Sequence, residues 1–506
     1  MDSESIWYGA APSETQSPAA DTLPEDRRHV QLRENARFFL LLSLSLGAAF
    51  ALLFVNAHAL GLNALLLSAA MDGATLLALG KLGLREKKRD AFWAVSLLLL
   101  GVSVFWTSNA MTQDVSFFGM FLAELLWLMN AFADILSWRF GRVVSGTLRL
   151  IGRIITHIPE PFRHAAADRR GGSKQVRSVL LGLVIALPLV WVVASLLASA
   201  DAAFGALVER LFGAWSVSEA VRTAVRIVFY TLIPAVVFYA ALAAQTECSD
   251  FPAKEKARAN ALVAVTFTAV LAVVYAVFCG IQIAVLFAGN VAALPAGMTY
   301  AEYAREGFFQ LLLVSAINVA VIIVAQRRFV LNRVLRALLV FLTVCTYLLE
   351  ASSAVRMMLY VNDYGLTYLR LLVLWFLVLL ALILGAAVYT VFRGEFRLFR
   401  FTLFACMALW LVFAFARPDA IAARYNLARR GLDDTTETQI AYESSCDAVS
   451  ALRPYLSQID ECGRDEAIYR NLTDTVSQEY AKRGMRSFNY SVWQATKTAE
   501  DYAHGT

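Results

Sequence analysis

The sequence of 506 residues predicts an all-α, polytopic helical membrane protein with about 11 transmembrane helices. Hydrophobic residues make up 59% of the chain and charged residues only 17%, and the mean hydropathy is +0.58. An ordinary soluble domain has far more charged residues than this. The apolar residues form long runs, and the basic residues alternate between the gaps that separate these runs. Together, the composition, the run lengths and the charge pattern predict the fold class.

Eleven apolar stretches have the length of a membrane span. A helix needs about 20 mostly apolar residues to cross about 30 Å of hydrocarbon, and it satisfies its backbone polar groups within its own segment. We therefore expect helical spans at residues 38–57, 60–80, 91–107, 117–137, 179–199, 224–244, 262–287, 306–326, 335–353, 369–391 and 399–416.

Lys and Arg are concentrated in every second gap between these stretches. The positions before the first stretch and after each even-numbered one hold 28 of the 45 basic residues, the other gaps hold six, and the tail holds eleven. Cytoplasmic loops carry the excess of basic residues in membrane proteins. The pattern predicts a cytoplasmic N-terminus and an outer C-terminal tail, and it explains the net charge of +5 without a nucleic-acid partner.

These boundaries divide the chain into five predicted segments. The start lacks the apolar core of a cleavable signal peptide, and we expect the protein in the bacterial plasma membrane. The segments are a disordered cytoplasmic tail (1–36), a first membrane bundle with spans one to four (37–137), a basic amphipathic cytoplasmic segment (138–177), a main membrane domain with spans five to eleven (178–416) and an extracytoplasmic helical tail (417–506).

The fourth span is the weakest because it contains Glu124, Asn130 and Asp134. If this stretch did not cross, the nine basic residues between Arg139 and Arg177 would lie outside, against the usual charge bias. We therefore keep it as a span.

Two further segments have the pattern of helices that lie along the membrane surface. Apolar residues recur at helical spacing from Val143 to Ile158, opposite several arginines, and Pro159 and Pro161 follow. This pattern predicts a basic amphipathic helix on the inner surface, either a linker, which we favour, or a lipid-sensing or partner-binding element. On the outer side, we expect Asp201 to cap a second such helix.

The tail is polar and has two amphipathic patterns, 449–459 and 468–480, which we expect to form helices that dock on the membrane domain or on each other. Cys446 and Cys462 flank the first pattern. If one helix joined them, their Cα atoms would lie about 24 Å apart, beyond the limit of about 7 Å for a disulfide. A bridge would require a break near Pro454, and we favour no disulfide.

Ionisable residues inside spans are candidates for a transport path or a proton relay, because their burial in hydrocarbon is costly. They are Asp72, Glu124, Asp134, Arg226 and Glu350. Structural pairing is the interpretation that we favour, with Glu350 and Arg356 as the preferred pair.

The stretch from Thr299 to Leu312 has the pattern of a capped helix start. Thr299 and Glu302 form a capping box, and Glu302 stands three residues before Arg305. Capping and anchoring explain this stretch slightly better than a binding role.

Motifs for cofactors and metals are missing from the sequence. The five histidines form no cluster with Cys, Asp or Glu at metal-site spacing, and there is no phosphate loop, dinucleotide fingerprint or nucleophile elbow. We predict no cofactor and no metal, and the enzyme hypothesis is weakened.

Several longer stretches resemble a known family. They are residues 196–204 (LLASADAAF), 275–289 (YAVFCGIQIAVLFAG), 299–312, 353–370 (SAVRMMLYVNDYGLTYLR) and 417–427 (RPDAIAARYNL). The chain resembles bacterial membrane proteins grouped as domain of unknown function 4173, with its relative 4153, from span five onward. At position 417 the family more often has Asn where this chain has Arg. The resemblance implies no activity, substrate or catalytic residue.

The family-like stretches bring opposite charges to the predicted outer face, where they would form a vestibule or join helix ends. Exposed pairs stabilise by only about 0–1 kcal/mol, so a joining network has to be partly buried. The candidate functional residues, most of them on this face, are Asp201, Glu302, Arg305, Glu306, Glu350, Arg356, Asp363, Arg370, Asp419 and Arg424.

Three functions remain open from the sequence. The leading hypothesis is a non-enzymatic envelope scaffold, sensor or assembly factor that acts at its outer face, with the lipid bilayer and an envelope protein as partners. The second is a transporter that uses intramembrane acids. The third is a membrane enzyme that acts on a lipid-linked substrate.

Overall fold

The computed structural model describes eight stretches of the chain and three single residues. The stretches are 27–167, 219–246, 259–287, 300–393, 396–431, 433–455, 476–481 and 483–503, and the single residues are 193, 197 and 201. Within this part of the chain every named element is a helix, and one isolated bridge pairs Ala259 with Phe329. The predicted all-α fold class is confirmed.

Ten helices in the described residues are long and apolar enough to cross a membrane. They coincide with ten of the eleven predicted spans, while the predicted fifth span (179–199) lies outside the described residues except for positions 193 and 197. The helices are α2 (Ala36–Phe54), α3 (Leu62–Lys81), α4 (Lys87–Trp106), α5 (Ala110–Phe132), α10 (Glu219–Thr246), α11 (Ala261–Phe287), α12 (Tyr300–Arg328), α13 (Arg333–Tyr364), α14 (Tyr368–Phe392) and α15 (Leu398–Phe415).

The doubtful fourth span is the helix α5, shifted toward the N-terminus relative to the prediction. It begins at Ala110 because the Asn109 side chain caps it, accepting from the Thr112 N–H at 2.9 Å. It ends at Phe132, so Asp134 follows the helix and is exposed. The predicted position of Asp134 inside a span is therefore wrong.

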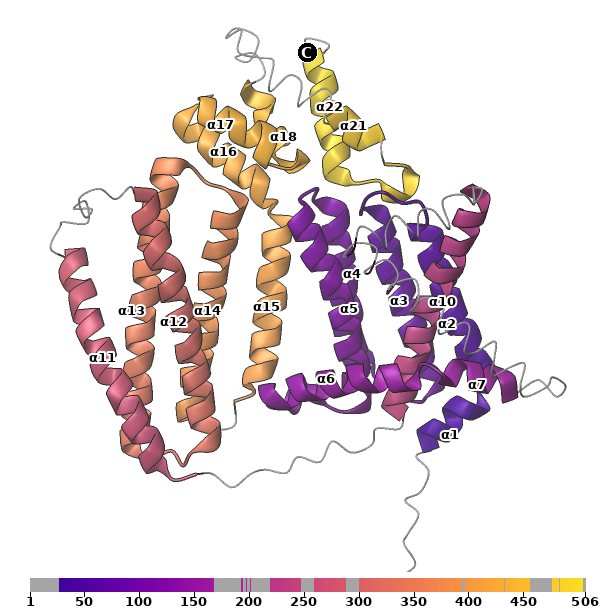
Figure 1. The fold of residues 1–506 in the computed structure, drawn as a ribbon, viewed down its shortest axis with the longest axis horizontal. Helices are drawn as coiled ribbons and strands as arrows, with labels where there is room; N and C mark the ends of the chain where they lie inside the picture. The colour runs from indigo at the N-terminus through magenta and orange to yellow at the C-terminus, as the bar shows by residue number, and fades with distance from the viewer. Residues whose placement is uncertain are drawn as a thin grey trace, which may run out of the picture.

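The upright helices form two groups (Figure 1). Helices α2–α5 pack with α10 in the first group, whereas α11–α14 pack with one another in the second. Helix α15 lies between the groups and contacts both α4 and α14. Helix α10 therefore packs against α2 and α6, although the predicted boundaries assign its residues to the later segment. Trp93, Trp127 and Tyr239 are among the largest fully buried side chains of the first group.

Three short helices lie at the lower end of the upright helices in Figure 1: α1 (Arg27–Glu34), α6 (Phe140–His157) and α7 (Glu160–Ala167). Helix α6 runs across the ends of the spans, and we call this end of the molecule the α6 end. On α6 itself, Val143 and Leu150 are buried, whereas Leu148 and Ile155 remain more than 60% exposed. The predicted amphipathic helix is thus present.

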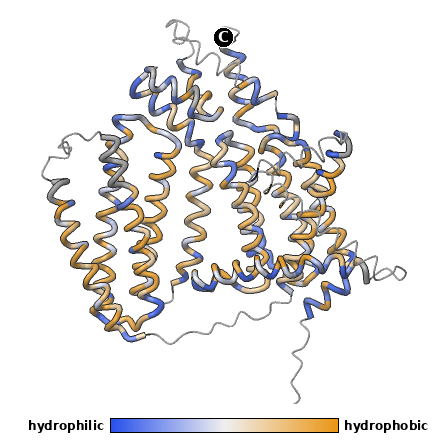
Figure 2. The backbone as a smooth tube through the Cα atoms, in the orientation of Figure 1, coloured by the Kyte–Doolittle hydropathy of each residue, from blue (hydrophilic) through white to orange (hydrophobic). Residues whose placement is uncertain are grey.

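The opposite end carries a polar cap, which we define as the described residues from Arg417 to the end of the last helix. In Figure 2 the cap is mostly hydrophilic and the spans are mostly hydrophobic. Its elements are α16 (Pro418–Arg430), α17 (Asp434–Thr438), a π-helical turn (Gln439–Glu443), η3 (Cys446–Ala448), α18 (Val449–Leu452), η4 (Arg453–Tyr455), α21 (Val476–Ala481), η6 (Met485–Ser487) and α22 (Tyr490–Ala503).

The tail helix predicted at 449–459 does not continue through residues 453–455, and this part of the prediction is wrong. Helix α18 ends at Leu452, and a 3₁₀ turn follows at Arg453–Tyr455, because Pro454 has no N–H to continue the helix. Residues 456–475, which hold most of the second predicted pattern, lie outside the described residues. Leu427, Val449 and Leu452 form part of a small apolar core within the cap.

Helices α2 and α10 approach each other closely at Gly47. A Cβ atom at this position would lie 2.9 Å from the carbonyl carbon of Thr231 and 3.1 Å from the Cβ of Ala235.

We expect Gly47→Leu to lower the stability of the first group by about 1–3 kcal/mol, because overpacking forces the backbones apart. The measurement is thermal unfolding in detergent. Gly73→Leu is the matched control, since a Cβ at Gly73 meets no atom within 4 Å; equal losses in both variants would contradict the prediction.

Candidate functional site

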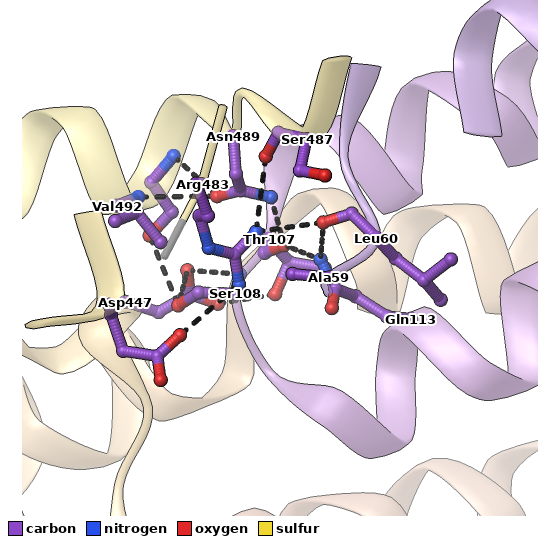
Figure 3. A network of polar contacts seen from close by, with 12 residues as sticks. Ala59, Leu60, Thr107, Ser108, Gln113, Asp447, Arg483, Ser487, Asn489 and Val492 are labelled. Atoms are coloured by element: carbon purple, nitrogen blue, oxygen red, sulfur yellow. Dashed lines mark hydrogen bonds and ion pairs between the residues drawn. The ribbon is translucent and has the colours of Figure 1, made fainter. Parts of the chain in front are cut away.

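The cap is joined to the membrane helices most directly through Asp447, whose side chain is fully buried. Its carboxylate accepts from the hydroxyl of Thr107, from the backbone N–H of Ser108 at 2.9 Å and from the Ser108 hydroxyl at 3.0 Å. Figure 3 shows Asp447 lying against this α4–α5 turn. Hydrogen bonds to a charged acceptor in a dry site are the stronger kind.

A second carboxylate, that of Asp419 in the first turn of α16, reaches the same turn. It accepts from the Asn109 side-chain amide at 2.9 Å, and from the backbone N–H and hydroxyl of Ser445 at 3.0 and 2.6 Å. Burial raises the pKa of Asp419 above its usual range, and the bonds from Ser445 and Asn109 act against that rise. Asp419 therefore links the α4–α5 turn to two segments of the cap.

The carbonyl groups at the end of α4 receive their hydrogen bonds from side chains. The last carbonyls of a helix have no partner within the helix itself. Asn489 in the cap donates to the oxygens of Val104 and Thr107 at 3.2 and 2.8 Å, and Gln113 on α5 donates to the same two oxygens at 3.0 and 2.8 Å. Figure 3 shows the two amides converging on this helix end.

The cap also holds the turn between α2 and α3. Arg483 donates to the carbonyl of Leu60 at 2.8 Å, and the N–H of Leu62 donates to the carbonyl of Phe488 at 2.8 Å. The backbones come so close here that a Cβ at Gly61 would lie 2.7 Å from the Ser487 carbonyl oxygen. These contacts tie the cap to a second turn of the first helix group.

The third attachment point is the turn between α13 and α14, which belongs to the second helix group. Asn426 on α16 accepts from the N–H of Leu366 at 2.7 Å and donates to its carbonyl at 2.8 Å. Arg430 donates to the carbonyls of Asn362, at 3.0 Å, and Asp363. The cap thus joins both helix groups at the same end of the molecule.

Arg417 occupies the junction between α15 and the cap. Its backbone has φ +52°, the left-handed region that non-glycine residues rarely adopt. The guanidinium lies 4.4 Å from the ring centroid of Trp106 and 5.1 Å from that of Tyr490, and it donates to the Gln494 side chain at 2.7 Å. Burial lowers the pKa of Arg417. These cation–π contacts hold the backbone of the junction against Trp106 of the first helix group.

Two other predicted residues, Arg370 and Asp363, lie at the α13–α14 turn, and a third, Arg424, lies elsewhere on α16. Arg370 donates to the carbonyls of Tyr364, at 2.9 Å, and Gly365, and it lies 4.1 Å from the Tyr360 ring centroid. Asp363 is exposed and contributes its carbonyl to Arg430. Arg424 is exposed on the surface of the cap.

For the remaining predicted outer residues, the described part of the chain does not include the side chains or the helix that would test their predicted roles. Asp201 is exposed, and its N–H donates to Leu197 at 2.9 Å, but the helix that it was expected to cap lies outside the described residues. Glu302, Arg305 and Glu306 lie in the first turns of α12, and their side chains fall outside the described part, as does Thr299.

Three intramembrane acids are buried without the pairing that we favoured. Both carboxylate oxygens of Asp72 and of Glu350 lack a hydrogen-bond partner, while Glu124 accepts from Thr75 with one oxygen only. The expected pairing of Glu350 with Arg356 is wrong, because six residues turn a helix by about 240° and place the two side chains on different faces. Asp72 and Glu124 lie on the neighbouring helices α3 and α5.

Arg226, the fifth intramembrane candidate, donates to the Asn56 side chain at 3.1 Å.

Sequence reasoning missed the residues that carry the attachment, namely Asp447, Asn489 and Arg483. The available signal was the run Thr107-Ser108-Asn109 in a short gap between two spans, because a polar run of this kind requires partners if something covers it.

In the described residues no group of three His, Cys, Asp or Glu side chains could hold a metal ion. Asp419 and Asp447 already accept three hydrogen bonds each, so their arrangement supports attachment and not proton transfer.

Comparison with known proteins identifies a family. The model of the family described as "Domain of unknown function (DUF4153)" matches residues 94–455, from within α4 to the middle of the cap. This match begins earlier than the resemblance from span five onward, and the relation to family 4173 stays a prediction. The search of curated proteins and the search of solved structures returned no match.

Removal of the Asp447 carboxylate is expected to release the cap. Asp447→Ala leaves the buried donors of Thr107 and Ser108 without acceptors, which should lower the opening free energy of α22 by about 2–4 kcal/mol. Hydrogen exchange of the α22 amides measures this opening. Asp501→Ala is the control, because Asp501 pairs with Arg453 at an exposed site and should contribute at most about 1 kcal/mol. Unchanged exchange in Asp447→Ala would contradict the attachment role.

The thiol of Cys446 is expected to resist alkylation in the folded protein. Burial, with the nearby Asp447 and Glu479, raises its pKa from 9.0 to about 12, which lowers the thiolate fraction near neutral pH roughly 1000-fold. Mass spectrometry of the Cys446 peptide after treatment with iodoacetamide under reducing conditions should show label only when the protein is denatured. Similar labelling rates in folded and denatured protein would refute this expectation.

Proposed function

We propose that this chain, which belongs to the DUF4153 family of unknown function, is a non-enzymatic scaffold of the bacterial envelope that acts through its cap. The family model covers 362 of the 506 residues (94–455). The ten long apolar helices of its described residues make it a multi-pass membrane protein. The alternation of basic loops supports a cap that faces outward from the plasma membrane and an α6 end that faces the cytoplasm.

The observation that carries this proposal is the use of buried polar side chains for attachment. Asp447, Asp419, Asn489 and Asn426 are each at most 2% exposed, and their hydrogen bonds connect the cap to turns of both helix groups. Such a network fixes the cap relative to the bundle, since each broken bond leaves a buried group unsatisfied. A rigid platform of this kind suits the presentation of a binding surface.

A basic depression on the cap supports a protein partner with an acidic surface. It has a volume of about 560 Å³ and is lined by Arg424, Arg453, Tyr455 and their neighbours. Arginine and tyrosine are enriched where protein interfaces have their strongest contacts. The partner in this proposal is an envelope protein that contacts the depression.

A second candidate function is transport coupled to protons or cations. Asp72 is 6% exposed and Glu124 is 7% exposed, and together they have three carboxylate oxygens without a hydrogen-bond partner. An intramembrane carboxylate without a partner is costly, and such groups commonly serve ion or proton pathways. This observation favours transport as the alternative to the scaffold.

Complementation of a deletion strain separates the two functions. If the scaffold is correct, Asp447→Asn combined with Thr107→Val should fail to restore envelope resistance to detergent and osmotic downshift, because the cap is detached. Asp72→Asn combined with Glu124→Gln should restore it, since these nearly isosteric changes remove only the ionisable groups. The resistance of each strain is the measurement, at equal membrane abundance of the variants.

The reverse pattern would decide for transport: loss with the Asp72 and Glu124 variant and full rescue with the cap variant. Glu500→Gln serves as the matched cap control, because Glu500 is an exposed side chain of α22 and does not line the depression.

A further inference from the structure

A basic pocket opens at the α6 end, where the two helix groups meet. Its walls come from residues 137–139, which directly precede α6, from the ends of α12 and α14 and from the starts of α13 and α15, and its volume is about 510 Å³. Figure 1 shows α6 reaching the lower end of α15 at this place. The pocket therefore lies between elements that are far apart in the chain.

Four arginines line this pocket: Arg139, Arg327, Arg336 and Arg397. No acidic side chain is among its lining residues in the described part of the chain. The side chains of Thr390 and Gln326 are already hydrogen-bonded, because Thr390 donates to Gln326, which donates to the carbonyl of Ala387 at 2.8 Å. Arg327, Arg336 and Arg397 alone bring three positive charges to one pocket, and such a cluster produces a potential that favours an anion.

The floor of the pocket and its continuation are apolar. Ile323, Val391 and Phe399 line its interior. Arg336 and Phe392 also belong to an adjacent groove of about 560 Å³, which runs along α13 past Ala337, Val340 and Val344. The spacing of three and four residues places these side chains on one helix face. The anion site is thus continuous with an apolar slot directed along a membrane span.

We propose that the basic pocket and this groove form one binding site for an anionic phospholipid, with the phosphate among the arginines and an acyl chain along α13. Arginine presents a planar fork of donors that matches the oxygens of a phosphate. Basic pockets between spans at the cytoplasmic side are a known kind of headgroup site. A free phosphate would use only the basic half of the site.

The neighbouring surface is suited to the membrane interface. Leu148, Ile151 and Ile155 of α6 are exposed large apolar side chains, which a lipid layer would cover. A lipid in the pocket would contact residues 137–139 and α15 on one side and α12, α13 and α14 on the other. It would join the two helix groups at the end opposite the cap, a role independent of the proposed cap function.

The test uses the full-length protein in detergent with three probes: phosphatidylglycerol, phosphatidylcholine with the same acyl chains, and glycerol phosphate. Native mass spectrometry counts retained lipid, and thermal unfolding measures stabilisation. We expect phosphatidylglycerol alone to be retained and to raise Tm. Arg327→Gln with Arg397→Gln should weaken its binding at least roughly tenfold, since two charge-assisted contacts to phosphate are lost.

Arg328→Gln with Arg400→Gln is the matched control, because it removes equal charge beside the pocket and neither residue lines it. Ala337→Trp fills the groove and should weaken lipid binding without any change of charge. If the double arginine variant does not fold, this variant and the lipid count of the native protein decide the question. Equal retention of both lipids, or equal stabilisation by glycerol phosphate alone, would overturn the proposal.

Discussion

Backbone groups at the ends of membrane helices need hydrogen-bond partners, and the architecture of this protein depends on how its cap supplies them. Within a span the helix satisfies its own N–H and C=O groups, but the last carbonyls have no partner inside it. Here Asn489 donates to Val104 and Thr107, Arg483 donates to Leu60, and Asn426 pairs with both backbone groups of Leu366. The cap is therefore part of the membrane fold and not a separate appended domain.

This arrangement gives a structural role to buried polar residues that would otherwise be candidates for catalysis. Asp419 and Asp447 are buried carboxylates, yet each accepts three hydrogen bonds from groups of the cap or the α4–α5 turn. A general base needs a lone pair directed at a substrate, and these are directed at structural donors. Asp72 and Glu124 differ because most of their oxygens have no donor, and for this reason they support the alternative function of transport.

The two ends of the bundle are held by different chemistry. At the cap end, neutral and charged side chains bond to backbone groups of three turns, so protein alone joins the two helix groups. At the α6 end, four arginines surround a pocket without a lining acid, and an apolar groove leads away from it along α13. An anionic lipid in that pocket would bring negative charge to these arginines, and the membrane would then stabilise the end that the cap does not reach.

The sequence alone determined ten of the eleven predicted spans and their order in the described part of the chain, because apolar length is a local property that the thickness of the hydrocarbon imposes directly. It also identified Asp419 as a candidate, but not Asp447 or Asn489, whose partners lie more than 300 residues away in the chain. The position of Asp134 was wrong because α5 ends at Phe132. The Glu350–Arg356 pair was wrong because the two side chains lie on different faces of α13. Only the tertiary structure brought the cap onto three turns and four arginines into one pocket, since such contacts depend on packing between distant helices.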